Sequence, residues 1–261
     1  MGNHQKEVQI EMSPNSLLEI RSVSKNFGGV TAVKSVSFTV NRGETVGLIG
    51  PNGAGKTTLF NLITGFAKPD GGTVIFESQN ITSRSTANIV NNGIARTFQI
   101  VRPFANIPVY ENVLIAALSS RSRKVSKKSP EVVASESLRK AGLASKAGVN
   151  AVQLTHGEQK RLELARAIAT SPSLLMLDEP FSGLGSDEVG PAATLIRELK
   201  ESGTTIIVIE HRLKELMKLV ERVIAMDQGS IISDGLPQDV VNDSRVIESY
   251  LGKGTTFAKG K

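Results

Sequence analysis

The chain has 261 residues, of which 39% are hydrophobic, as is ordinary for a soluble protein with one large or two small domains. It has no cysteine, which excludes disulfides and thiolate metal sites, and its formal net charge of +6 suits nucleic acid, anionic lipid or merely a solvated surface. Its apolar runs are far shorter than the roughly 20 residues of a membrane helix, and its N-terminus lacks the apolar core of a secretory signal. We expect a protein that stays inside the cell without crossing a membrane.

The N-terminal part predicts a small antiparallel sheet. Residues 1–16 are expected to form a disordered tail, and the stretches 17–27 and 30–40 that follow alternate and are rich in β-branched residues. Because two glycines separate these stretches, they predict antiparallel strands. Further on, the short apolar run 44–50 predicts a strand, and apolar residues at helical spacing predict a helix over 55–66.

The middle of the chain predicts a helical subdomain. From about residue 99 to about 154 the strand pattern disappears, and the remaining periodicity favours helices. Residues 121–128 contain five basic side chains in eight positions. We interpret this run as a solvated connector between helices, with a phosphate or lipid contact as the alternative.

The C-terminal half alternates between strand and helix patterns. Buried strands are predicted near 173–177, 204–209 and 222–226, with amphipathic helices between them. Such alternation predicts an α/β fold with a mostly parallel sheet. The predicted domain covers 17–252, with the helical part as an insertion, and 253–261 is expected to be a C-terminal tail.

A glycine-rich turn joins the strand at 44–50 to the helix that follows. It fits the phosphate-loop pattern G-x-x-x-x-G-K-[ST], with the expected nucleotide-binding residues Gly50, Pro51, Asn52, Gly53, Ala54, Gly55, Lys56, Thr57 and Thr58. Glycines let backbone N–H groups turn toward a phosphate, and the helix start adds unpaired donors. The alternative is a turn that only connects two elements. The pattern predicts a nucleoside triphosphate site, with Lys56 on the phosphates and Thr57 on Mg²⁺.

Two adjacent carboxylates follow the buried strand near 173–177. Asp178 is expected to hold Mg²⁺ opposite Thr57, and Glu179 to orient and deprotonate an attacking water. Paired acids at a strand end are also common helix caps. The presence of Lys56 in the same chain favours the catalytic interpretation.

A short polar turn opens a helix over 154–169, where Thr155 and Glu158 have the spacing of a capping box. A helix start of this kind can hold a γ-phosphate on its backbone donors. Together with the phosphate loop and the acidic pair, it resembles the signature motif of the ATP-binding cassette (ABC) proteins, a family of P-loop NTPases. The resemblance covers about residues 17–252.

The resemblance implies roles for further residues. Phe27 matches the aromatic that stacks on adenine, Gln99 the glutamine that helps to hold Mg²⁺ and acts in catalysis, and His211 the catalytic switch histidine. Thr155 and Gly157 match the residues that contact the nucleotide of a second cassette. Considered alone, Phe27 is also compatible with a core aromatic, His211 with a helix cap, and Gln99 with no special role.

Two positions depart from the family pattern. His156 stands where the signature commonly has glycine, and Gly185 stands where the loop after Glu179 commonly has aspartate. These departures put communication between two nucleotide sites in doubt, whereas they leave the residues expected to hydrolyse ATP unchanged.

The partners expected from the resemblance are a second cassette chain, two transmembrane permease subunits and, indirectly, a periplasmic or extracellular substrate-binding protein. The chain is most similar to the importer ATPases for branched-chain amino acids, which implies a place on the cytoplasmic face of the membrane and a contact through Phe104 to Tyr110. An ATPase of lipopolysaccharide export is the alternative. A nucleic-acid ATPase is less favoured, because no sustained heptad repeat separates Lys56 from Asp178, and no nucleic-acid partner is expected.

Overall fold

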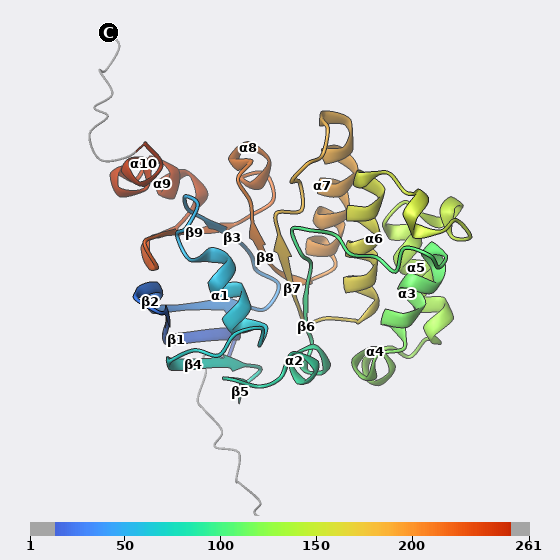
Figure 1. Ribbon diagram of the computed structural model, residues 1–261, viewed down its shortest axis with the longest axis horizontal. Coiled ribbons are helices and arrows are strands. Elements are labelled where there is room, and N and C mark those ends of the chain that lie inside the picture. The colour runs from blue at the N-terminus through green and yellow to red at the C-terminus, as the bar shows by residue number, and fades with distance from the viewer. Residues whose placement is uncertain (1–13, 252–261) are drawn as a thin grey trace, which may run out of the picture.

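The computed structural model describes residues 14–251, so that the predicted tails at 1–13 and 253–261 lie outside the described residues. Two sheets lie close together, with helices on the far side of the larger one (Figure 1). The smaller sheet is antiparallel and has the order β2-β1-β4-β5. Its strands are β1 (Ser16–Phe27), β2 (Val30–Asn41), β4 (Gly71–Phe76) and β5 (Gln79–Asn80). The predicted strand pair is confirmed, although Ser16, the last residue of the predicted tail, already belongs to β1.

The larger sheet has the order β10-β9-β3-β8-β7-β6. All its neighbours pair in parallel except β9 and β10, which confirms the predicted mostly parallel sheet. The strands are β3 (Thr45–Ile49), β6 (Ile94–Arg96), β7 (Leu174–Asp178), β8 (Thr205–Ile209), β9 (Arg222–Asp227) and β10 (Ser230–Gly235). Every residue of β3, β7 and β8 is buried, as expected for strands covered on both faces.

Five helices accompany the larger sheet: α1 (Lys56–Ile63), α7 (Ser186–Glu201), α8 (Leu213–Leu216), α9 (Pro237–Asn242) and α10 (Ser244–Leu251). Helix α8 has only four residues, because the chain turns after Met217 before it enters β9. Within residues 14–251, no helix combines the length and apolar character that a membrane crossing requires.

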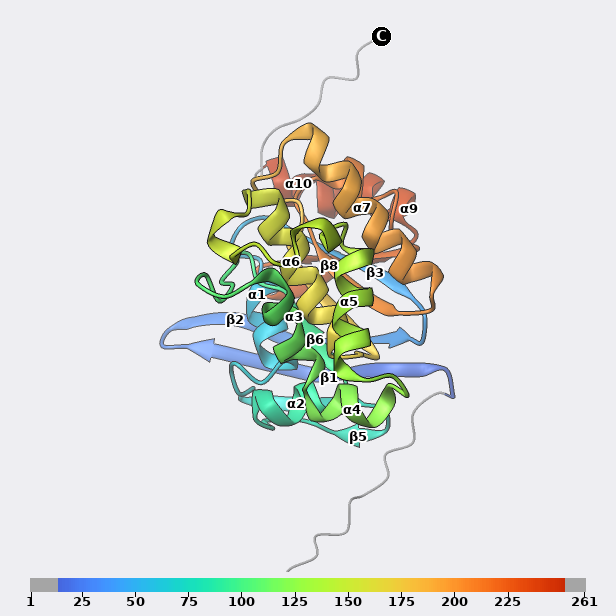
Figure 2. The ribbon, with the colours of Figure 1, turned by 90° about the vertical axis from the view of Figure 1, so that its right-hand side faces the viewer.

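The helical part contains α2 (Thr86–Asn92), α3 (Val109–Ala117), α4 (Ser120–Val125), α5 (Pro130–Lys140) and α6 (His156–Ala169), with short 3₁₀ turns at Ala144–Lys146 and Ala151–Gln153. Helix α6 begins just beyond the predicted insertion, yet it packs against α3 and α5 in one apolar core (Figure 2). It therefore belongs to the same layer. The domain limits themselves stay a prediction.

The interpretation of 121–128 as a connector is wrong for most of its length. Residues 120–125 form α4, because the Ser119 hydroxyl caps the helix by accepting from the Ser122 N–H. Arg121 is fixed as well, since its guanidinium donates to the Ser173 hydroxyl at 2.6 Å and to the Ser171 carbonyl at 3.3 Å. Arg121 therefore has a structural role within this basic run.

Candidate nucleotide-binding site

The phosphate loop connects β3 to α1, as the sequence predicts. Gly50, Gly53 and Gly55 have φ angles of 148°, 83° and 102°, which L side chains rarely adopt. Gly55 is also the N-cap of α1, and no side chain caps this helix start. The N–H groups of its first turn therefore remain available to an anion, and the helix dipole adds positive potential there.

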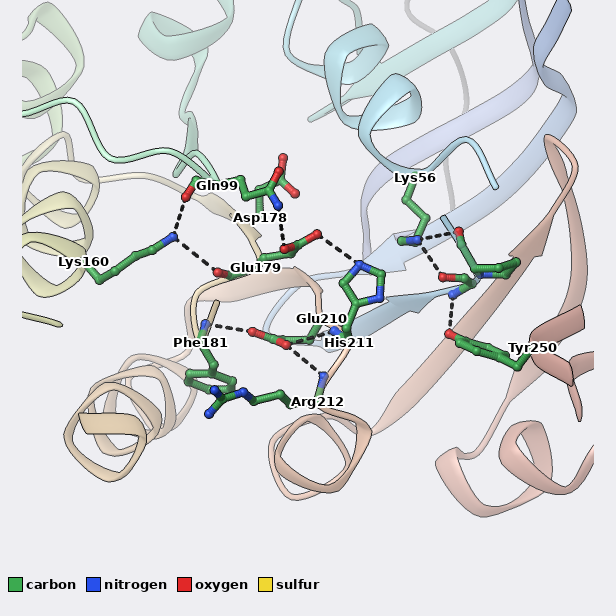
Figure 3. A network of polar contacts seen from close by, with 12 residues as sticks. Lys56, Gln99, Lys160, Asp178, Glu179, Phe181, Glu210, His211, Arg212 and Tyr250 are labelled. Atoms are coloured by element: carbon green, nitrogen blue, oxygen red, sulfur yellow. Dashed lines mark hydrogen bonds and ion pairs between the residues drawn. The ribbon is translucent and has the colours of Figure 1, made fainter. Parts of the chain in front are cut away.

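Lys56 is the first residue of α1, and its side chain is buried under the loop. Its ammonium donates to the Gly50 carbonyl at 2.6 Å and to the Pro51 carbonyl at 3.0 Å (Figure 3). Burial lowers the pKa of Lys56, while the negative charges of Glu179 and Asp178 oppose this effect. The ammonium is held by carbonyls that a phosphate can replace as its partner.

A cleft of about 510 Å³ opens in front of this loop. It is lined by Val30, Thr31, Ala32, Asn52, Gly53, Ala54, Gly55, Lys56, Thr57, Thr58, Gln99, Glu179, His211 and Gln228. Its lining brings together most of the predicted site residues, which come from four separate stretches of the sequence: the phosphate loop, Gln99, Glu179 and His211. A second hollow of about 570 Å³, between α7 and α8, contains none of them.

Glu179 projects into the cleft directly after β7, at a φ of 51° that is unusual for a residue with a side chain. One carboxylate oxygen lies 3.0 Å from Nε2 of His211, and the other accepts from the Gln99 amide nitrogen at 2.9 Å. Figure 3 shows the three side chains meeting at this point. The sequence predicted these residues as catalytic, and the structure brings them into contact. Backbone strain at such a residue is typical of functional sites.

Asp178 lies behind the cleft rather than in its lining, and it is buried. Its carboxylate is bound by the guanidinium of Arg96 at 2.6 Å, and only 5% of each side chain is exposed. Arg96 also donates to Asn61 of α1 at 2.6 Å. The ion pair thus ties β6, β7 and α1 together beneath the phosphate loop. Arg96 was not among the predicted site residues, although it stands three positions before Gln99.

Two further buried charges position the catalytic loops. Lys160 on α6 donates to the Gln99 carbonyl at 2.7 Å and to the Glu179 carbonyl at 3.4 Å. Glu210, directly before His211, accepts from the backbone N–H groups of Phe181, His211 and Arg212 at 2.7 to 3.0 Å. In the sequence, Lys160 could have been recognised as a charged residue on the buried face of a predicted helix. Glu210 could have been recognised as the neighbour of His211.

The predicted capping box at the start of α6 is present, with Thr155 and Glu158 as reciprocal partners. Neither Thr155 nor Gly157 lines the cleft of its own chain, because α6 and α1 lie on opposite sides of β7 (Figure 1). Gly157 has no space for a side chain, since Glu188 lies against it. The first-turn donors of α6 therefore face away from the phosphate loop of the same molecule.

The two departures from the family pattern lie near each other. Nε2 of His156 is 3.4 Å from the Ser182 carbonyl, and a side chain at Gly183 would collide with the imidazole. Gly185 is the N-cap of α7, where its N–H donates to Glu188 at 3.1 Å. The imidazole thus connects the start of α6 to the loop after Glu179 within one chain.

Phe27 is 52% exposed, so that its interpretation as a core aromatic is wrong. It ends β1 and pairs in register with Val30, which lines the cleft. The Lys25 ammonium lies 5.4 Å from its ring centroid. Phe27 itself is outside the cleft lining, next to a residue that belongs to it.

We expect Phe27→Ala to weaken the binding of both ATP and GTP by about 1 to 3 kcal/mol, because stacking uses a π-face that the two purines share. Equilibrium titration with each nucleotide measures the effect. Phe104→Ala is the matched control, since Phe104 is an equally exposed ring in the helical part. Unchanged affinity in the Phe27 variant would remove this residue from the site.

Glu163, next to the site, makes the free energy of unfolding depend on pH. It is 8% exposed on α6 and accepts from the Phe98 N–H at 2.7 Å, next to Gln99. Burial raises its pKa from 4.5 to about 7, against the lowering effects of the Phe98 N–H, Lys160 and Arg166. The folded chain therefore holds this proton more tightly than the unfolded chain does. The free energy of unfolding should consequently fall as the pH rises from about 4.5 to about 7.

In Glu163→Gln this dependence should disappear, because the amide does not titrate but still accepts from Phe98. Denaturant unfolding at several pH values should show the wild type losing up to about 3 kcal/mol relative to the variant across that window. Curves that stay parallel between pH 4.5 and 7 would contradict the raised pKa.

Comparison with known proteins supports the same conclusion as the geometry. The ABC transporter family model matches residues 33–182, and a model described as branched-chain amino acid ATP-binding cassette transporter matches residues 230–255. The high-affinity branched-chain amino acid transport ATP-binding protein LivG of Escherichia coli (strain K12) is 38% identical over 250 residues, which cover 91% of this chain and 98% of LivG. BraF of Pseudomonas aeruginosa, a protein of the same description, is 35% identical with the same coverage.

Solved structures agree in fold. A crystal structure of the ADP conformation of an ATP-binding cassette of an ABC transporter has a TM-score of 0.81 at 34% identity, covering 91% of this chain and 99% of that one. A dimeric cassette in a post-hydrolysis state, bound to ADP and phosphate, has a TM-score of 0.75 at 26% identity over 85% of this chain and 99% of that chain. This chain therefore belongs to the ABC transporter family, as one of its ATP-binding cassette ATPases.

Proposed function

We propose that this chain is the ATP-hydrolysing subunit of a membrane importer for branched-chain or related amino acids. The observation that carries the proposal is the position of Glu179, which lies in the phosphate-loop cleft between His211 and Gln99. A carboxylate fixed on both oxygens can orient a water and accept its proton, and the imidazole of His211 holds that carboxylate in place.

Mg²⁺ fits the residues at this site. The cleft lining offers oxygen atoms, the ligand type that Mg²⁺ prefers, and Mg²⁺ uses few protein ligands together with phosphates and water. Thr57 would offer its hydroxyl and Gln99 its amide oxygen, while the amide nitrogen of Gln99 donates to Glu179. Asp178 would act on the ion from behind the cleft, with its carboxylate held by the Arg96 guanidinium. Bound there, the ion would neutralise charge on the phosphates.

A second cassette chain would complete the site. Thr155 and Gly157 lie outside the cleft of their own chain. The capping box of α6 uses the Glu158 N–H, which leaves the N–H groups of His156 and Gly157 to meet an anion from another molecule. A similar cassette forms dimers with ADP and phosphate bound. Two chains placed head to tail would close the Lys56 loop of one and the Thr155 turn of the other over one ATP.

The remaining partners would be two transmembrane permease subunits, which place the cassette on the cytoplasmic face of the membrane, and a substrate-binding protein outside it. The segment between β6 and α3, which includes the predicted contact from Phe104 onward, has exposed apolar side chains for such a contact, with Ile100 and Phe104 exposed by 68% and 48%. The amino-acid substrate is supported by the names of LivG and BraF, and by the match at residues 230–255.

The test is uptake of labelled leucine, isoleucine and valine by cells that carry the gene, by cells from which it is deleted, and by cells complemented with wild type or Lys56→Ala. The proposal expects uptake to fail on deletion and to be restored by the wild-type chain alone. Uptake that is unaffected by deletion, combined with a defect in lipopolysaccharide export, would favour the alternative ATPase class.

A further inference from the structure

The C-terminal helix α10 contacts the phosphate loop through the side chain of Tyr250. The hydroxyl of Tyr250 accepts a hydrogen bond from the Gly50 N–H at 2.8 Å (Figure 3). Gly50 is the first residue of the phosphate loop, and two hundred positions of sequence separate it from Tyr250. Burial raises the pKa of the Tyr250 phenol, whereas the Gly50 N–H opposes this change, so that the phenol stays protonated near neutral pH.

Gly50 is held on several sides. Its carbonyl, in the peptide to Pro51, accepts from the Lys56 ammonium at 2.6 Å, and its N–H, in the peptide from Ile49, donates to Tyr250. Behind it, the Met226 carbonyl at the end of β9 lies so close that no side chain fits at Gly50. The residue therefore has little freedom to move while all three contacts persist.

Phosphate binding depends on the same residue. The Lys56 ammonium has three donors, of which the carbonyls of Gly50 and Pro51 take two, so that the third can meet a phosphate while Gly50 stays in place. Tyr250 fixes the N–H of Gly50 and thereby holds the start of the loop in the form that presents Lys56 to a phosphate. A loop that is already ordered loses less conformational entropy when nucleotide binds, and a nucleotide that orders the loop favours the docked α10 in turn.

Helix α10 itself is attached lightly. Val246 is its one buried residue, while Ile247 and Leu251 are 38% and 41% exposed. An apolar hollow of about 230 Å³ remains between α10, the end of β3 and α8. A helix with so few buried contacts can undock at a low energetic cost, so its position can respond to what happens at the loop.

We propose that docking of α10 and nucleotide binding are coupled through Gly50, with Tyr250 as a positioning residue for the phosphate loop. Because coupling is reciprocal, a docked α10 raises nucleotide affinity, and bound nucleotide holds α10 in place. Any factor that undocks α10 from the phosphate loop would promote nucleotide release. The inference rests on nucleotide binding at this loop, which is part of the proposed function.

The first test compares ADP affinity in wild type, Tyr250→Phe and Tyr110→Phe. Removal of the Tyr250 hydroxyl leaves the Gly50 N–H without its acceptor, so we expect about fivefold or greater weakening of ADP binding. Tyr110→Phe removes the same atom from α3, far from the loop, and should bind ADP as the wild type does. Equal affinity in all three proteins would overturn the coupling but leave the proposed function intact. A wild type that fails to bind ADP would contradict the proposed function instead.

The second test detects the reciprocal effect, which a merely structural role would not produce. The chain has two tyrosines and no tryptophan, so Tyr110→Phe leaves Tyr250 as its only tyrosine. Addition of ADP to this variant should change the Tyr250 fluorescence, and amide hydrogen exchange of residues 244–251 should slow. In Tyr250→Phe the same amides should no longer respond to ADP. Exchange in α10 that is indifferent to ADP in the wild type would overturn the proposal.

Discussion

Replacement of Glu179 by glutamine is expected to slow ATP cleavage by about 10²- to 10⁴-fold while ATP still binds. Glutamine has nearly the same size and can keep contacts to His211 and Gln99, which lie 3.0 and 2.9 Å from the carboxylate oxygens. It cannot accept a proton from water at neutral pH. The substitution therefore slows the cleavage step and leaves the phosphate loop and Lys56 unchanged.

Single-turnover cleavage and equilibrium ATP binding separate the two effects of this substitution. Glu201→Gln at the exposed end of α7 is the matched control, and it should cleave ATP at the wild-type rate. If turnover survives in Glu179→Gln, the assignment of Glu179 as the catalytic base is wrong.

Replacement of Arg96 by alanine is expected to lower the free energy of unfolding by about 3 to 5 kcal/mol, because it leaves the Asp178 carboxylate buried without its partner. Both side chains are 5% exposed, so solvent screens the pair little. The substitution also removes the hydrogen bond to Asn61 on α1. It should therefore loosen the phosphate loop as well as destabilise the fold.

Denaturant unfolding of Arg96→Ala and of the control Arg102→Ala measures this cost. Arg102 is exposed, and its loss should change stability by less than about 0.5 kcal/mol. Arg96→Lys should recover part of the stability, since it restores the charge without the planar two-sided contact. An alanine variant as stable as Arg102→Ala would show that the ion pair contributes nothing.

The elements predicted from the sequence are those with a clear period or a continuous apolar run. Strands β3, β7 and β8 are fully buried and read as apolar runs, while the phosphate loop is a contiguous motif. Strands β4, β5, β6 and β10 were not predicted; β5 and β6 have only two or three residues, which carry no period. Helix α4 was mistaken for a connector because its sequence is basic, although a serine cap starts it.

The predicted site residues all come from sequence motifs. These motifs place Lys56, Glu179 and His211 in the cleft, but they do not identify the other side chains that hold these residues in position. The Arg96 to Asp178 pair, the Lys160 bonds to the catalytic loops and the Tyr250 bond to Gly50 all join residues that are distant in sequence. Such contacts follow from the packing of the chain, which the linear pattern does not contain.

The central claim, that two chains close over ATP, is tested most directly by size-exclusion chromatography with light scattering on Glu179→Gln. With ATP and Mg²⁺ the uncleaved γ-phosphate should hold the Lys56 loop of one chain against the Thr155 turn of another, giving a dimer. With ADP, which lacks that group, the same protein should be monomeric. The experiment is repeated with the related cassette chain present, because that chain can be the required partner. A protein that binds ATP yet stays monomeric in both experiments would contradict the account.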